Sequence, residues 1–129
     1  MTNRNRLANV SNIYQTEAKR VLCVCSAGLL RSPTTANVLH QEYGFNTRAA
    51  GITEEYALIP VDQALIAWAD EIVWVEQAVY NKGWHDWKDL LKDKRNIVLN
   101  IPDQYEWNNP DLRAIIKKQY SETLHSVRG

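Results

Sequence analysis

After residue 20 the sequence alternates short apolar runs with longer amphipathic segments, and this alternation restricts the fold more than any other feature. Four apolar runs have the length and composition of buried strands: residues 21–24, 45–50, 71–75 and 96–101. Helical patterns cover 32–43, 61–69, 77–92 and the stretch that begins at Asn109 and Pro110. Strands that alternate with helices form parallel sheets with both faces covered. The sequence therefore predicts a three-layer α/β/α fold around a four-stranded parallel sheet.

A chain of 129 residues, 45% of them hydrophobic, is large enough for one domain with its own core. Residues 1–19 are polar with scattered apolar positions, and we expect them to be an N-terminal extension, either a short amphipathic helix or a loose arm. Residues 20–129 contain all the predicted strands, and we expect them to form the α/β domain.

Charge, hydropathy and cysteine usage exclude several classes of partner and compartment. The chain has 15 basic and 15 acidic residues, which argues against nucleic acid or an anionic membrane as the main partner. It has no apolar run long enough to span a bilayer and no signal-peptide pattern, so we expect a cytoplasmic protein. Its two cysteines, Cys23 and Cys25, make no disulfide framework, and we expect free thiols with Cys23 in the core.

The first predicted strand runs directly into a loop that starts at Cys25 and closes at Arg31. Such a loop can encircle one phosphate-sized dianion, because its backbone N–H groups can point inward and the following helix directs its positive end to the same point. Arg31 can bind two phosphate oxygens, and the same positive field favours the thiolate of Cys25. Ser32 is expected to cap the helix and to hydrogen-bond the thiol. The candidate phosphate-binding residues are Ser26, Ala27, Gly28, Leu29, Leu30, Arg31 and Ser32.

A Cys-x5-Arg spacing also occurs by chance, and the alternative is a buried cysteine at a strand end with Arg31 in a surface ion pair. The preceding strand and the following Ser-Pro helix start favour the phosphate loop. In parallel α/β sheets ligands bind beyond the carboxyl ends of the strands. The loops at those ends are 25–32, 51–56, 76–80 and 102–107, so the Cys25 loop falls where a site is expected.

The run from Val21 to Thr34, VLCVCSAGLLRSPT, resembles the signature of low-molecular-weight protein tyrosine phosphatases. Further resemblance lies in residues 50–52, 68–76 and 101–105, so that it extends over about residues 20–118 and is greatest to the short bacterial and phage-type members. The resemblance implies the fold of that family, with the phosphate loop after the first strand. It also implies that residues 20–129 form a phosphatase-like domain.

The resemblance implies a mechanism as well. Cys25 would attack phosphorus and form a phosphocysteine, Arg31 would bind the phosphoryl oxygens, and Asp103 would protonate the leaving group and then activate water. Asp111 is a second candidate for the acid, although it also suits a helix start. Tyr105 would stack on a phenyl ring or, alternatively, close its loop onto the core. The partner would be a phosphorylated protein or a small phosphate ester.

No cofactor is expected, and the three scattered histidines, His40, His85 and His125, indicate no metal site. We interpret Glu54, Glu55 and Glu76 at the predicted rim as solvated surface charge. The alternative is an acidic rim that disfavours strongly acidic substrates.

The chain departs from the family pattern at three positions and leaves other functions open. Gln104 follows the acid where the family usually has proline, Gly28 stands where asparagine is common, and Leu30 stands where many members have a second cysteine. The alternatives are an arsenate reductase-like enzyme, which usually recruits additional thiols, and a weak or inactive phosphate-binding or phosphocarrier module. Arg31 favours hydrolysis over phosphate carriage.

Overall fold

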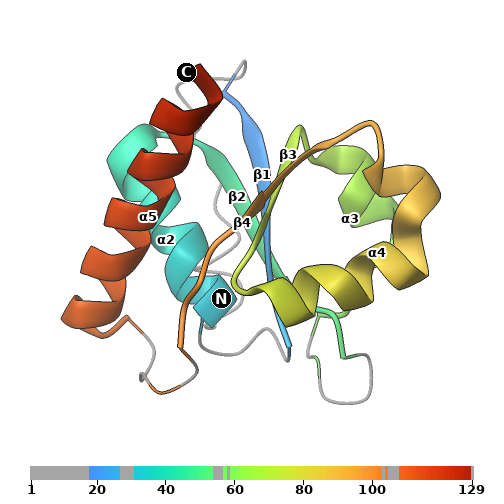
Figure 1. The fold of residues 1–129 in the computed structure, drawn as a ribbon, viewed down its shortest axis with the longest axis horizontal. Helices are drawn as coiled ribbons and strands as arrows, with labels where there is room; N and C mark the ends of the chain where they lie inside the picture. Colours follow the sequence, from blue (N-terminus) through green and yellow to red (C-terminus); the bar gives the residue numbers. More distant parts are fainter. Residues whose placement is uncertain are drawn as a thin grey trace, which may run out of the picture.

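The computed structural model describes residues 18–26, 31–53, 57, 59–102, 104 and 108–128, with side chains to residue 123 (Figure 1). The strands are β1 (Arg20–Cys25), β2 (Asn46–Gly51), β3 (Glu71–Trp74) and β4 (Arg95–Val98). The helices are α2 (Arg31–Tyr43), α3 (Gln63–Trp68), α4 (Gln77–Leu91) and α5 (Pro110–Arg128). The expected N-terminal extension lies outside the described residues except for its last two.

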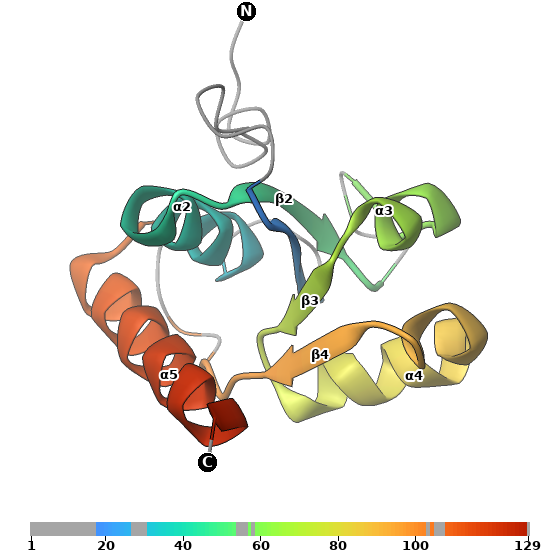
Figure 2. The same ribbon diagram turned by 90° about the horizontal axis from the view of Figure 1, so that it is seen from above.

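All four strands are parallel and lie in the order β2-β1-β3-β4. Helices α2 and α5 cover one face of the sheet, and α3 and α4 cover the other, as the view in Figure 2 shows. The predicted three-layer α/β/α architecture with a four-stranded parallel sheet is therefore confirmed. Because the central strands are covered on both sides, every residue of β3 and all of β1 after Arg20 are buried. This burial explains the apolar runs 21–25 and 72–75.

Most element boundaries differ from the sequence prediction by one or two residues, and two of the differences bear on the candidate site. Helix α2 begins at Arg31, so Ser32 lies inside the first helical turn and is not the cap that we expected. Strand β4 ends at Val98, although the prediction continued to residue 101. The chain beyond β4 still follows β3, since the Leu99 N–H donates to the Trp74 carbonyl at 2.8 Å and the Ile101 N–H donates to the Val75 carbonyl at 2.9 Å. Ile101 is thereby held at the carboxyl edge of the sheet.

A buried acidic residue lies at the opposite, amino-terminal edge. The Glu71 carboxylate is fully buried and accepts hydrogen bonds from Lys19 Nζ at 3.1 Å and from the Tyr120 hydroxyl at 2.7 Å. Arg95 Nε lies 2.8 Å from the same carboxylate. Burial and the Glu71 charge raise the pKa of Tyr120, so its hydroxyl remains a donor. Cys23 is fully buried, as we predicted, and burial raises the pKa of its thiol as well.

Helix α4 packs against β3 through a glycine. Gly83 is buried against the ring of Trp74, and a Cβ atom at this position would overlap the ring. We therefore expect Gly83→Ala to lower the free energy of unfolding by about 1–3 kcal/mol through overpacking. At a solvent-exposed helix position the same substitution would raise the free energy of unfolding by about 1 kcal/mol. A decrease would therefore show that Gly83 is packed against Trp74.

Urea unfolding followed by circular dichroism measures the effect of Gly83→Ala. A double mutant with Trp74→Phe provides the control, because the smaller ring makes room for the methyl group and the two changes should be less than additive. A stabilising Gly83→Ala exchange would contradict this packing.

Candidate active site

Cys25 is the last residue of β1 and is almost completely buried. Its Sγ lies 3.1 Å from the hydroxyl oxygen of Ser32 on the first turn of α2. The Ser32 hydroxyl also lies 3.3 Å from the Ala50 carbonyl on β2, to which it can donate. The thiol therefore sits where the end of the central strand meets the start of a helix, next to a group that can donate a hydrogen bond to a thiolate.

Arg31 is the first residue of α2, and only 3% of its side chain is exposed. Its Nη1 donates to the Ile101 carbonyl at 3.0 Å and lies 3.1 Å from Oε1 of Glu76. Arg31 is therefore in an ion pair at the edge of the sheet, in which the guanidinium is buried and the Glu76 carboxylate is partly exposed. The interpretation of Glu76 as solvated charge is wrong, because its carboxylate contacts this guanidinium.

The ends of two strands supply the printed contacts of the Arg31 guanidinium: Glu76 follows β3 and Ile101 follows β4. Cys25 ends the neighbouring strand β1 and contacts Ser32, the residue after Arg31. The carboxyl ends of parallel strands meet at one edge of a sheet, where ligands of such folds bind. The structure thus brings Cys25, Arg31 and Ser32 together at the predicted edge, and it adds Glu76 to them.

The loop residues Ala27–Leu30, the proposed acid Asp103 and the aromatic Tyr105 lie outside the described residues. Ser26 is described and half-buried directly after Cys25, and its carbonyl accepts a hydrogen bond from the Thr53 N–H at 2.8 Å. Asp111 is exposed in the first turn of α5, where its N–H donates to the Asn109 side chain at 2.8 Å. That position is the helix-start role that the sequence offered as its alternative to the acid.

Both ends of segment 102–107, which carries Asp103, are attached to α2. At one end the Ile101 carbonyl accepts from Arg31. At the other end Asn108 has a positive φ of 62° and donates its backbone N–H to the hydroxyl of Thr34 at 2.8 Å. The Asn108 side-chain oxygen accepts from Arg113 at 2.6 Å and from Asn37 at 3.4 Å. The sequence analysis missed Asn108, although asparagine is one of the few residues that tolerate a positive φ.

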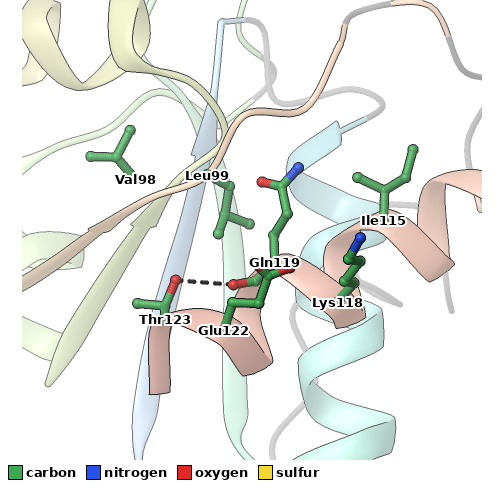
Figure 3. A pocket seen from close by; sticks show the side chains of 7 residues that line it. All are labelled: Val98, Leu99, Ile115, Lys118, Gln119, Glu122 and Thr123. Atoms are coloured by element: carbon green, nitrogen blue, oxygen red, sulfur yellow. Dashed lines mark hydrogen bonds between the residues drawn. The ribbon is translucent and has the colours of Figure 1, made fainter. Parts of the chain in front are cut away.

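A hollow of about 620 Å³ between β4 and α5 shares no lining residue with this site. Val98, Leu99 and Ile115 line it, and Lys118, Gln119, Glu122 and Thr123 on α5 complete it (Figure 3). The Gln119 side chain pairs with the backbone of Asn100, accepting from its N–H at 2.7 Å and donating to its carbonyl at 2.9 Å. Its lining contains neither a thiol nor a guanidinium, so the candidate site remains the one at Cys25 and Arg31.

Among the described residues, no group of three or more His, Cys, Asp or Glu side chains is arranged to hold a metal ion. None of the described helices is long and apolar enough to cross a membrane.

No protein-family model matches the sequence, and no curated protein matches it either. Several solved structures do match. The YwlE arginine phosphatase from Geobacillus stearothermophilus has a TM-score of 0.62 at 18% identity, covering 85% of this chain and 95% of that chain. Wzb from Vibrio vulnificus in complex with benzylphosphonate has a TM-score of 0.61 at 17% identity, covering 84% and 96%. A YwlE mutant from Bacillus subtilis has a TM-score of 0.62 at 13% identity, covering 87% and 100%.

These similarities extend over nearly the whole length of each compared protein. The fold is therefore that of low-molecular-weight phosphatases, as the resemblance in the sequence implied. At these identities the similarity defines the architecture, and the chemistry has to be argued from the residues of this chain.

Proposed function

We propose that the protein is a cysteine-dependent phosphomonoesterase that acts on an aryl phosphate, phosphotyrosine in a protein. The observation that carries the proposal is the placement of the Cys25 thiol and the buried Arg31 guanidinium at the carboxyl edge of a phosphatase fold. Phosphoryl transfer to sulfur requires a thiol nucleophile and a group that binds the phosphoryl oxygens. A guanidinium can bind two of those oxygens at once.

In the proposed reaction the Cys25 thiolate attacks phosphorus, the P–S bond forms, and the P–O bond to the leaving group breaks. Arg31 and the backbone N–H groups of Ser26–Leu30 stabilise the charge on the phosphoryl oxygens. Asp103 gives its proton to the leaving oxygen and then takes a proton from water, which attacks phosphorus and releases phosphate and the thiolate. Ser32 donates its hydrogen bond to the departing sulfur, which its 3.1 Å contact supports.

The aromatic preference rests on Tyr105, which follows Asp103 in the sequence and would stack on a phenyl ring. The name of one similar structure, an arginine phosphatase, makes phosphoarginine the comparison substrate. Peptides that differ only in phosphotyrosine or phosphoarginine should be separated by their kcat/KM values, and we expect the phosphotyrosine peptide to be the better substrate.

The other two functions are less well supported. A thiol relay of the arsenate reductase kind needs a second reactive cysteine, and the only other cysteine, Cys23, is fully buried with a raised pKa. A phosphocarrier needs a phosphocysteine that persists, whereas an arginine that binds the phosphoryl oxygens stabilises the transition state for its hydrolysis.

The direct test is hydrolysis of para-nitrophenyl phosphate at mildly acidic pH in the presence of EDTA. We expect turnover without added metal and competitive inhibition by vanadate. Failure to turn over this ester while phosphate or vanadate still binds would contradict the enzyme and favour a phosphate-binding module.

Replacement of the proposed acid should depend on the leaving group. Loss of a positioned general acid costs about 10²–10⁴-fold in rate, and the cost rises with the basicity of the leaving oxygen. We therefore expect Asp103→Asn to slow hydrolysis of phenyl phosphate far more than that of para-nitrophenyl phosphate, as measured by kcat. The matched control is Asp111→Asn, which should leave both rates unchanged. The opposite pattern would assign the acid role to Asp111.

A further inference from the structure

Arg31 is a charged group that the fold removes from water. Its side chain is 3% exposed, and a buried charge is tolerated only when it is paired and hydrogen-bonded. The Ile101 carbonyl supplies a neutral acceptor at 3.0 Å, and Glu76 supplies the negative charge at 3.1 Å. Both acceptors contact the same nitrogen, Nη1, and they come from the ends of two different strands.

Glu76 occupies the N-cap position of α4, yet its carboxylate makes no hydrogen bond to that helix. An acidic side chain at a helix start is normally explained by the cap or by the helix dipole. Here the side chain extends away from its own helix to Arg31, and 36% of it remains exposed. The contact with the Arg31 guanidinium therefore explains why a glutamate stands at this position.

A guanidinium is planar, so holding one of its nitrogens from two directions restricts the orientation of the whole group. Nη1 is held by Glu76 and Ile101, and the opposite edge, formed by Nε and Nη2, is the other pair of donors that can contact two oxygens side by side. An orientation fixed before substrate binds lowers the entropic cost of binding and of reaching the transition state.

We propose that Glu76 is a positioning residue, which orients the Arg31 guanidinium to bind the phosphoryl group of the substrate. The inference deepens the function proposed above and rests on it. It also predicts where Glu76 acts. Because Arg31 would contact the phosphoryl oxygens and not the leaving group, loss of Glu76 should reduce activity to the same extent for every leaving group.

The test compares Glu76→Ala and Glu76→Gln with the wild type. Glutamine keeps the length of the side chain and an oxygen acceptor, so it should retain part of the orientation without the charge. We expect Glu76→Ala to lower kcat/KM about 10²-fold and to weaken inorganic phosphate binding about 10-fold, magnitudes typical of a lost charge-assisted contact. Glu76→Gln should fall between the alanine variant and the wild type. Both esters, phenyl phosphate and para-nitrophenyl phosphate, should be affected equally, unlike in Asp103→Asn.

Glu42→Ala is the matched control, because Glu42 is a helical glutamate that pairs with Lys117 on the surface of α2 and α5. It should leave kcat/KM and phosphate binding unchanged. Circular dichroism and urea unfolding of each variant separate a loss of folding from a loss of orientation, and the glutamine variant retains the packing.

Unchanged phosphate binding and kcat/KM in folded Glu76→Ala would overturn the inference. Tighter phosphate binding would also overturn it, because Glu76 would then compete with the ligand for Arg31. A wild type that binds phosphate through a Glu76-dependent contact but hydrolyses no ester would overturn the proposed function alone. A wild type that does not bind phosphate at all would overturn both.

Discussion

Replacing Cys25 by serine should lower kcat for para-nitrophenyl phosphate by at least about 10⁴-fold, the size of effect seen when a nucleophile is removed. The hydroxyl of serine is a far weaker nucleophile than a thiolate, since it is almost wholly protonated at neutral pH. The substitution is small, and a serine oxygen can keep a hydrogen bond with Ser32, whose hydroxyl lies 3.1 Å from the sulfur. Folding and phosphate binding should therefore persist while turnover is lost.

Cys23→Ala provides the matched control for Cys25→Ser. Cys23 lies two residues earlier on the same strand and is fully buried. Its truncation should lower the free energy of unfolding and leave kcat of the folded protein near that of the wild type. The phosphocysteine mechanism would be wrong if Cys25→Ser retained wild-type turnover, or if Cys23→Ala abolished it in a folded protein.

Glu71→Ala should lower the free energy of unfolding by about 3–5 kcal/mol, the usual cost of breaking a buried ion pair by removing one partner. The carboxylate is fully buried and is contacted by Lys19, Arg95 and Tyr120. Its removal leaves two cations close together and a buried hydroxyl without its acceptor. Urea unfolding measures the change.

Glu42→Ala again provides a comparison, because Glu42 is a glutamate in an exposed pair with Lys117. Exposed pairs contribute little to stability, so this variant should unfold at nearly the wild-type urea concentration. Equal effects of Glu71→Ala and Glu42→Ala would show that the Glu71 cluster is not a buried electrostatic centre.

The architecture could be predicted because strands that are buried on both faces of a parallel sheet have a recognisable, continuously apolar sequence. Apolar runs such as residues 21–24 and 72–75 have no polar alternation, and helical patterns separate them. The proximity of Cys25 and Arg31 followed from the same logic, since a strand end and a helix start fix both ends of a short loop. The contact between Cys25 and Ser32 has the same origin.

The charged contacts could not be predicted in this way. Glu71 begins a strand and Glu76 follows it, and both look like residues at the surface. Their partners, Lys19 and Arg31, lie 52 and 45 residues earlier in the chain, and only the assembled sheet brings each pair together. Glu76 does carry a weak signal, because an acidic residue at the carboxyl end of a strand beside the Arg31 loop is well placed to pair with that arginine.

The attachment of Ile101 and Asn108 to α2 affects how such a protein can evolve. Because both ends of segment 102–107 are held, altering or lengthening the chain between them adds little closure entropy and leaves the sheet and Arg31 in place. Arg31, which would bind the phosphoryl group, is thus separate in the chain from a connecting segment that can be exchanged. If Asp103 acts as proposed, replacement of residues 102–107 would change the leaving-group preference and leave the sheet and the Arg31 contacts as they are.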